Sequence, residues 1–237
     1  MLDTQENNNV LVNYIILSNK DWHQDFVSKL NEKNLNSKWF LINRMEDLNI
    51  DKLNQINPKK IFIPHWSHKI PDIIYLNYEC ILFHMTDLPY GRGGSPLQNL
   101  IKNGHSTTKI TAIKVTEGID EGPIYLKKDL DLSGTAKEIF LRSSKIIFSM
   151  ITEIIRDLPK SQKQIGEVVL FKRRKPNQSK ITNLKSIDEL YDHIRMLDCE
   201  GYPKAFLEFE NFRLEFEKSK IIDKNNLTAI VNFKQIK

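Results

Sequence analysis

The chain has 237 residues, with 35 basic and 30 acidic side chains and a formal net charge of +5. This length accommodates one α/β domain with a small additional unit. Hydrophobic residues make up 40% and charged residues 27%, which excludes disordered and fibrous proteins. With only two cysteines, Cys80 and Cys199, a disulfide scaffold and a four-cysteine zinc site are excluded as well.

Polar residues interrupt every hydrophobic stretch before it approaches the ~18 residues that a membrane-spanning helix needs. The polar, acidic N-terminus does not resemble a signal peptide. We therefore expect a soluble protein in the reducing cytoplasm. The sequence pI of about 9.0 permits a phosphate-bearing partner but is low for a strong nucleic-acid binder.

Short apolar runs alternate with amphipathic segments along the first half of the chain. The runs predicted as strands are 10–17, 38–42, 60–64, 80–83 and 109–115, and helices are expected at 22–31 and 46–56. This alternation predicts an α/β fold with a Rossmann-like, mostly parallel open sheet and flanking helices.

The clearest predicted helix covers 135–157. Thr135 and Glu138 have capping-box spacing, apolar residues recur every three or four positions, and Pro159 ends the pattern. We expect this helix to belong to the core and assign it no chemistry. It closes a predicted catalytic domain over residues 1–159.

The remaining residues, 160–237, predict a small α+β subdomain. A polar linker at 160–164 precedes a β-rich run at 168–171, and Ser186 with Glu189 predicts a second capped helix to about Leu197. Alternating residues at 206–209 and from 212 onward then predict two strands joined by a turn at 210–211.

The segment 80–98 carries the strongest chemical signal. Its buried strand ends in His84, and a loop with three glycines and two prolines follows. Ligands bind at the carboxyl ends of strands in open α/β sheets, and histidine can serve there as a general base. The alternative, a half-buried histidine that only packs, stays open on this pattern alone. Ser95 and Pro96 predict the start of a helix just beyond the loop.

A second loop, 117–122, contains Asp120 between two glycines. An aspartate close to His84 would hold the imidazole and favour its protonated form. Taken alone the loop is equally compatible with an ordinary turn.

Together these segments resemble the 10-formyltetrahydrofolate-dependent formyltransferases, a family that includes methionyl-tRNA, glycinamide ribonucleotide and sugar N-formyltransferases. The resemblance rests on His84-Met-Thr-Asp-Leu-Pro89-Tyr-Gly-Arg92-Gly-Gly-Ser-Pro96 and on Gly118-Ile-Asp120-Glu-Gly122-Pro. Residues 171–176 and 194–206 resemble the small C-terminal domain of the tRNA and sugar enzymes. The amino-acid sequence of the first motif is most similar to that of the sugar enzymes of bacterial surface-glycan and pseudaminic-acid pathways.

The resemblance implies transfer of a formyl group from 10-formyltetrahydrofolate to an amine, with His84 and Asp120 as catalytic residues and no metal. The acceptor implied is a nucleotide-linked amino-deoxy sugar, while nucleic acid and membrane are not expected as partners and a homodimer stays open. The implied folate-binding residues are Trp66, Ser67, His68, Ile70, Asp87, Leu88, Pro89, Glu117, Gly118 and Ile119. The implied substrate-binding residues are Arg92, Gly93, Thr86, His65, Lys172 and Arg173, with Arg174 as a further candidate for phosphate contact.

One position departs from the family pattern. The family has an asparagine two residues before the histidine, thought to stabilise the oxyanion, whereas this chain has Leu82. Loss of one oxyanion donor typically slows a reaction by roughly 100- to 1,000-fold. Thr86 and His65 are the candidate replacements, and the sequence does not choose between them.

Several alternatives remain at this stage. Methionyl-tRNA is a second candidate acceptor, and Leu82 raises the possibility of a relative that binds folate or nucleotide without catalysis. The basic run 172–175 is as compatible with a solvated strand end as with phosphate contact. Trp66 is as compatible with a core residue as with a residue of the folate pocket. A metal at His65 and His68 lacks further ligands nearby. His23, His105 and His193 are predicted to be surface or packing residues.

Overall fold

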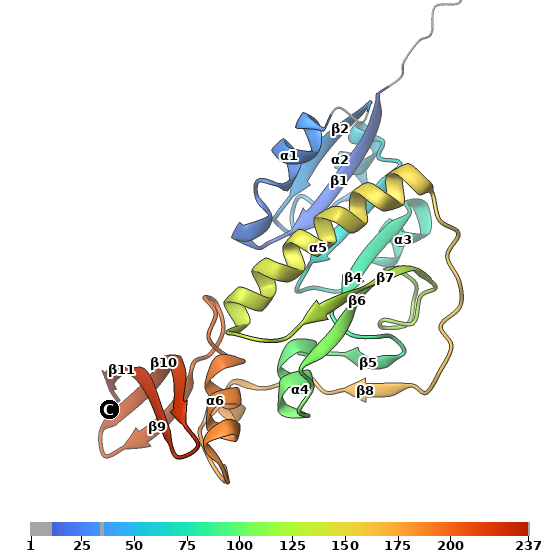
Figure 1. Cartoon of the computed structure of the whole chain (residues 1–237). Coiled ribbons are helices and arrows are strands. Elements are labelled where there is room, and N and C mark those ends of the chain that lie inside the picture. Colours follow the sequence, from blue (N-terminus) through green and yellow to red (C-terminus); the bar gives the residue numbers. More distant parts are fainter. Residues whose placement is uncertain (1–10, 34–35, 237) are drawn as a thin grey trace, which may run out of the picture.

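The computed structural model describes residues 11–33 and 36–236, and its central feature is a six-stranded sheet in the order β2-β1-β3-β4-β6-β7 (Figure 1). These strands are β1 (Val12–Ser18), β2 (Ser37–Ile42), β3 (Lys60–His65), β4 (Cys80–His84), β6 (Thr107–Lys114) and β7 (Ile124–Asp131). The first four strands of this order pair in parallel with one another, while β6 pairs antiparallel with both β4 and β7. The predicted mostly parallel α/β sheet is therefore confirmed, with an antiparallel pair at one edge.

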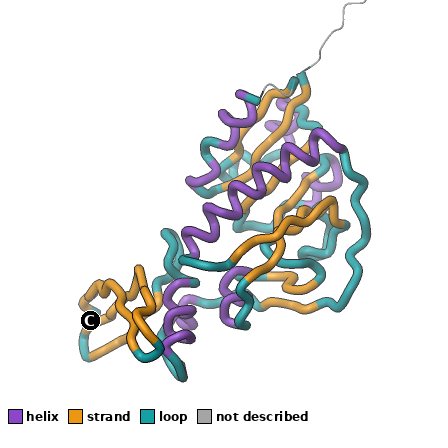
Figure 2. The backbone as a smooth tube through the Cα atoms, viewed as in Figure 1, coloured by secondary structure: helices purple, strands orange, loops and turns teal. Residues whose placement is uncertain are grey.

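Helices cover both faces of this sheet (Figure 2). They are α1 (Phe26–Glu32), α2 (Ile50–Ile56), α3 (Asp72–Asn77), α4 (Pro96–Lys102) and α5 (Ala136–Asp157). Ile16 and Phe62 pack in one core with α1, α4 and α5, whereas Ile15 and Ile61 pack in a second core with α2 and α3. Successive side chains of a strand point to opposite faces, so a sheet covered on both sides needs continuous apolar strands.

Two predicted helices are shorter in the structure than expected. The segment predicted at 22–31 divides into a 3₁₀ turn, Asp21–His23, and the helix α1. The segment predicted at 46–56 becomes helical only at Ile50, because the Asn49 side chain accepts a hydrogen bond from the Lys52 N–H at 2.9 Å and fixes the N-terminus there.

The long helix α5 begins and ends where the sequence predicts. Thr135 and Glu138 form the capping box, and Leu158 adopts the left-handed conformation directly before Pro159. Its buried face joins the first core, so the predicted core role is confirmed.

Residues 160–171 run back along the preceding part of the chain rather than away from it. The backbone of Gln162 pairs with Ile124, and β8 (Val169–Phe171) pairs in parallel with β5 (Tyr90–Gly93). The division of the chain at residue 159 stays a prediction.

The C-terminal residues form α6 (Ile187–Arg195) and an antiparallel sheet of β9 (Ala205–Phe209), β10 (Phe212–Asp223) and β11 (Asn226–Gln235). The turn predicted at 210–211 joins β9 to β10. Ser186 caps α6 by accepting the Glu189 N–H, but the Glu189 carboxylate accepts the Lys185 N–H instead of closing a box on Ser186.

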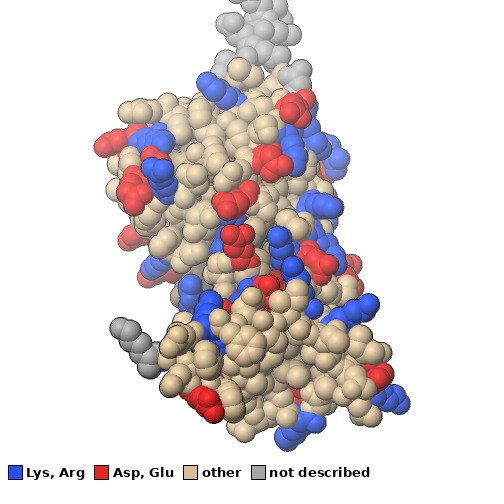
Figure 3. All heavy atoms as spheres, turned by 90° about the vertical axis from the view of Figure 1, so that its left-hand side faces the viewer, with Lys and Arg blue, Asp and Glu red and all other residues tan. Residues whose placement is uncertain are grey.

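Charges of both signs are interspersed over the face of the molecule shown in Figure 3. Within residues 11–33 and 36–236, no helix is long and apolar enough to cross a membrane.

Candidate active site

A cavity of about 510 Å³ lies at the carboxyl ends of β1, β3 and β4, where parallel strands present ligand sites. The carboxyl end of β4 contributes Leu82, Phe83 and His84 to its wall. The opposite wall comes from the residues after β8 and from Tyr202, near the C-terminal sheet. The site therefore lies between the six-stranded sheet and the C-terminal residues.

His84 and Asp120 meet in this cavity. Nδ1 of His84 lies 3.5 Å from Oδ2 of Asp120, and the two side chains are 8% and 9% exposed. Nε2 of His84 lies 2.8 Å from the carbonyl oxygen of Gly91, which can only accept, so Nε2 carries a proton. Nδ1 is therefore the nitrogen at which the neutral ring can take up a proton, beside a carboxylate that would stabilise the resulting imidazolium.

The connection between β6 and β7 presents Asp120. Asp120 has a φ of +55°, in the left-handed region that few non-glycine residues adopt. At Gly122, a Cβ would stand 1.7 Å from the carbonyl oxygen of Lys114, so only glycine allows this close approach. The Gly93 N–H then donates to Oδ2 of Asp120 at 2.8 Å and fixes the carboxylate.

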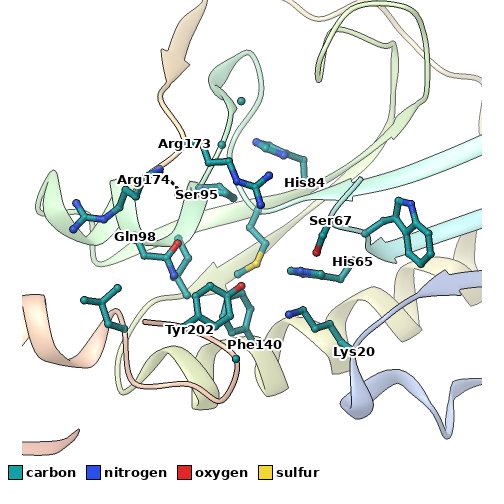
Figure 4. Close-up of a pocket in the computed structure, with 18 of the residues that line it drawn as sticks. Lys20, His65, Ser67, His84, Ser95, Gln98, Phe140, Arg173, Arg174 and Tyr202 are labelled. Atoms are coloured by element: carbon teal, nitrogen blue, oxygen red, sulfur yellow. Dashed lines mark hydrogen bonds between the residues drawn. The ribbon is translucent and has the colours of Figure 1, made fainter. Parts of the chain in front are cut away.

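Basic side chains surround the space in front of His84. Figure 4 shows Arg173, Lys20 and His65 extending toward the same opening, with His84 beside Arg173. Burial, followed by the charges of Lys20 and Arg173, lowers the pKa of His65 to about 4. His65 is therefore a neutral imidazole at pH 7, with Phe140 packed edge-on at 6.1 Å between ring centroids.

Of the six predicted substrate-binding residues, the structure places His65, Gly93 and Arg173 in the cavity wall. It places the other three elsewhere. Thr86 is fully buried and its hydroxyl donates to the Gly91 carbonyl at 3.4 Å. The Arg92 guanidinium donates to Gln164, and Lys172 is exposed away from the cavity wall.

The ten predicted folate-binding residues are divided in a similar way. Trp66 and Ser67 line the cavity. The indole N–H of Trp66 is buried with no hydrogen-bond partner among the described residues. The others lie outside this cavity wall: Ile70, Leu88 and Pro89 are buried, Asp87 pairs with Lys127, and His68, Glu117 and Ile119 are exposed, with Gly118 half-buried. Their role in folate binding stays a prediction.

The sequence did not point to several residues of the site. Lys20 follows β1, so the strand-end rule that singled out His84 could have found it. Phe140 lies on α5, which we expected to be core only; it is buried and also forms cavity wall. Tyr202 stacks on Phe140 with 5.4 Å between the ring centroids, and no local sequence pattern predicts this long-range contact.

The three remaining histidines pack against specific partners. Nδ1 of His23 contacts the Ser18 hydroxyl at 2.8 Å, His105 contacts the Tyr90 hydroxyl at 2.9 Å, and His193 contacts the Ser179 carbonyl at 3.1 Å. In the part of the chain that the structure describes, no three His, Cys, Asp or Glu side chains are grouped to hold a metal ion.

Comparison with known proteins identifies the family. Residues 176–234 match the model of the methionyl-tRNA formyltransferase C-terminal domain. The methionyl-tRNA formyltransferase of Thermodesulfovibrio yellowstonii is 23% identical over 197 residues, covering 79% of this chain and 63% of that protein. The chain spans about half to three fifths of the length of such curated relatives.

Solved structures agree with this assignment. A sugar N-formyltransferase from Shewanella shares the fold, with 15% identity, a TM-score of 0.69, and coverage of 90% of this chain and 99% of that one. The methionyl-tRNA formyltransferase structure from Clostridium thermocellum is 48% identical, with a TM-score of 0.92, and covers 95% of this chain and 100% of that chain. The chain therefore belongs to the formyltransferase family that includes the methionyl-tRNA formyltransferases.

Proposed function

We propose that this protein transfers the formyl group of 10-formyltetrahydrofolate to a primary amine on an acceptor that carries a nucleotide phosphate. The observation that carries the proposal is the His84–Asp120 pair in a cavity that Lys20 and Arg173 also line. A base beside an orienting carboxylate suits deprotonation of an attacking amine, and the cations suit an acceptor phosphate.

In the proposed reaction the acceptor nitrogen attacks the formyl carbon and forms a tetrahedral intermediate. The bond from that carbon to N10 of the folate then breaks, N10 takes a proton, and the acceptor leaves as an N-formyl amine. His84 takes the proton that the amine releases, at Nδ1, Asp120 stabilises the imidazolium, and His84 then passes this proton to N10. Holding both reactants in one cavity supplies much of the acceleration.

We further propose that His65 donates a hydrogen bond to the oxyanion in place of the asparagine that Leu82 replaces. A neutral imidazole has one N–H to donate, and His65 lies in the cavity wall with Leu82 and His84. Thr86 is the weaker candidate, because its hydroxyl is buried and donates to Gly91.

For the acceptor we propose a nucleotide-linked amino-deoxy sugar of the kind used in surface-glycan or pseudaminic-acid synthesis. A cavity of about 510 Å³ has the size typical of small-molecule sites. The net charge of +5 is modest for a tRNA-binding protein. Acidic side chains are also interspersed with the basic ones on the face shown in Figure 3. Arg173, with Arg174 and Lys175 beside it in the cavity wall, would contact the phosphates.

Methionyl-tRNA is the second candidate, and the comparisons favour it. The 48% identical structure and the curated relatives reported above are named methionyl-tRNA formyltransferases. The aminoacyl end of a tRNA also presents a primary amine next to a nucleotide, so both acceptors suit the same groups in the cavity. A binding protein without turnover is the remaining alternative.

The test is formation of tetrahydrofolate from 10-formyltetrahydrofolate with UDP-, dTDP- and CMP-linked amino sugars and with methionyl-tRNA, using His84→Asn as the control. Turnover with a sugar that His84→Asn abolishes supports the proposal, whereas turnover with methionyl-tRNA alone establishes the second candidate. A gel shift with tRNA at two salt concentrations adds a binding measurement, since tRNA affinity falls steeply with salt. Failure to bind folate overturns the mechanism.

A further inference from the structure

We propose that Gln164 positions Asp120 for proton transfer and that Arg92 holds Gln164 in place; this inference rests on the proposed function. The sequence suggested only a polar linker at 160–164 and a phosphate-binding role for Arg92. The contacts of these two side chains indicate a different role for both.

The Gln164 amide joins two segments of the site. Its Nε2 donates to the backbone carbonyl oxygens of Asp120 at 2.8 Å and Gly122 at 2.9 Å. Its Oε1 accepts from Nε and Nη2 of Arg92 at 3.1 and 2.9 Å. Both amide hydrogens and the acceptor oxygen are therefore used, which fixes the orientation of the amide without ambiguity.

These bonds act on a residue in an uncommon backbone conformation. Asp120 has a φ of +55°, a conformation that persists only where neighbouring groups hold it. Gln164 holds its carbonyl, while the Gly93 N–H holds its carboxylate at 2.8 Å. The two ends of Asp120 are thus fixed independently, which sets the 3.5 Å separation from His84.

The position of Gln164 follows from the backbone before it. Gln162 exchanges two backbone hydrogen bonds with Ile124, at 2.7 and 2.8 Å, just after the Asp120 loop. Two residues further on, Gln164 lies next to that loop. Arg92 completes the arrangement, since its Nη1 also lies 3.3 Å from Oε1 of Glu121. The Arg92 guanidinium therefore contacts the Asp120 loop directly, through Glu121, and indirectly, through Gln164.

The test replaces the amide while keeping its shape. Gln164→Glu removes both donors and sets a carboxylate against two carbonyl oxygens, yet leaves an acceptor for Arg92. Because a misplacement of about 1 Å can slow catalysis by roughly 100-fold, we expect kcat to fall by about 10- to 100-fold. The KM values for folate and acceptor should stay within about threefold, since neither ligand contacts Gln164 in the proposed mechanism. Gln162→Glu makes the same chemical change on an exposed side chain and should retain wild-type kcat.

Two further measurements separate positioning from general damage. If Gln164 acts through Asp120, then Gln164→Glu should reduce kcat by less than twofold in an Asp120→Asn background. In histidine-labelled protein, the imidazole NMR signals of His84 should shift in Gln164→Glu and in Asp120→Asn, but not in Gln162→Glu.

Wild-type kcat in Gln164→Glu, a loss confined to KM, or a full additive loss in the double variant would overturn the inference. If the wild-type protein turns over no acceptor, the proposed function fails, and the NMR comparison still decides this inference. Unshifted His84 signals in Gln164→Glu would then overturn it.

Discussion

Oδ2 of Asp120 lies 3.5 Å from Nδ1 of His84, with both side chains withdrawn from water. Because the effective dielectric constant is lower at a buried site, a carboxylate attracts an imidazolium more strongly there than on a solvent-exposed surface. In the proposed reaction, Asp120 would therefore act as the counter-ion of the imidazolium that forms when the acceptor amine loses its proton.

Asp120→Asn keeps the shape of the side chain and removes its charge. We expect turnover to fall by about 10²- to 10⁴-fold, because the imidazolium loses its counter-ion. Steady-state kinetics with 10-formyltetrahydrofolate measure this, and circular dichroism checks the fold. Unchanged turnover would mean that Asp120 has no part in proton transfer.

A second substitution should restore the activity that is lost when the proposed oxyanion donor is removed. We expect His65→Ala to lower kcat by about 100-fold, the usual loss for one oxyanion donor. Adding Leu82→Asn to this variant restores an amide donor on the same strand face as His84 and should recover at least tenfold. Leu82→Asn alone should change kcat little, because His65 already supplies the bond. An unaffected His65→Ala enzyme would remove His65 from the mechanism.

Neighbouring basic residues should differ in their effect on acceptor binding. Arg173 lines the cavity and Lys172 does not. Since a charge-assisted hydrogen bond to phosphate is worth more than a neutral one, we expect Arg173→Ala to raise the acceptor KM by about tenfold without changing the folate KM. Lys172→Ala should leave both KM values as they are. Equal effects of the two variants would point to a diffuse basic surface.

Two glycines provide a matched test of the loop that carries Asp120. A Cβ at Gly122 would stand 1.7 Å from the Lys114 carbonyl oxygen, whereas at Gly104 nothing lies within 4 Å. We expect Gly122→Ala to destabilise the protein by at least about 2 kcal/mol, because β6 and β7 must shift to admit the Cβ, and to lose turnover. Gly104→Ala should cost only about 1 kcal/mol, from its positive φ. Urea unfolding of the two variants measures the difference.

Acid should destabilise the fold through His23. Burial, with a further contribution from nearby His65, lowers the pKa of His23 to about 3. The unfolded chain binds this proton near pH 6.5 and the folded chain near pH 3, so the unfolding free energy falls as the pH drops through this window. At pH 5 the expected loss from His23 is about 2 kcal/mol.

His23→Asn keeps a polar group beside Ser18 and removes the titration. Urea unfolding between pH 7 and pH 4.5 should show a shallower loss in this variant than in wild type. His68→Asn, at an exposed position, is the control. The same slope in His23→Asn and wild type would contradict the assignment.

The sequence by itself determined the α/β fold, the ends of α5, the turn at 210–211 and the place of His84 at a strand end. These features depend on period-two and period-3.6 patterns, capping residues and turn chemistry, all of which act over a few neighbouring positions. The motifs around His84 and Asp120 also pointed to the family.

Only the tertiary structure decided which side chains share the cavity. Arg92, expected to bind phosphate, donates to Gln164, while Lys20, Phe140 and Tyr202 reach the cavity from three distant segments. Contacts of this kind depend on how strand ends, helix faces and loops come together in space. The local sequence pattern around each residue does not predict which distant residues it will contact.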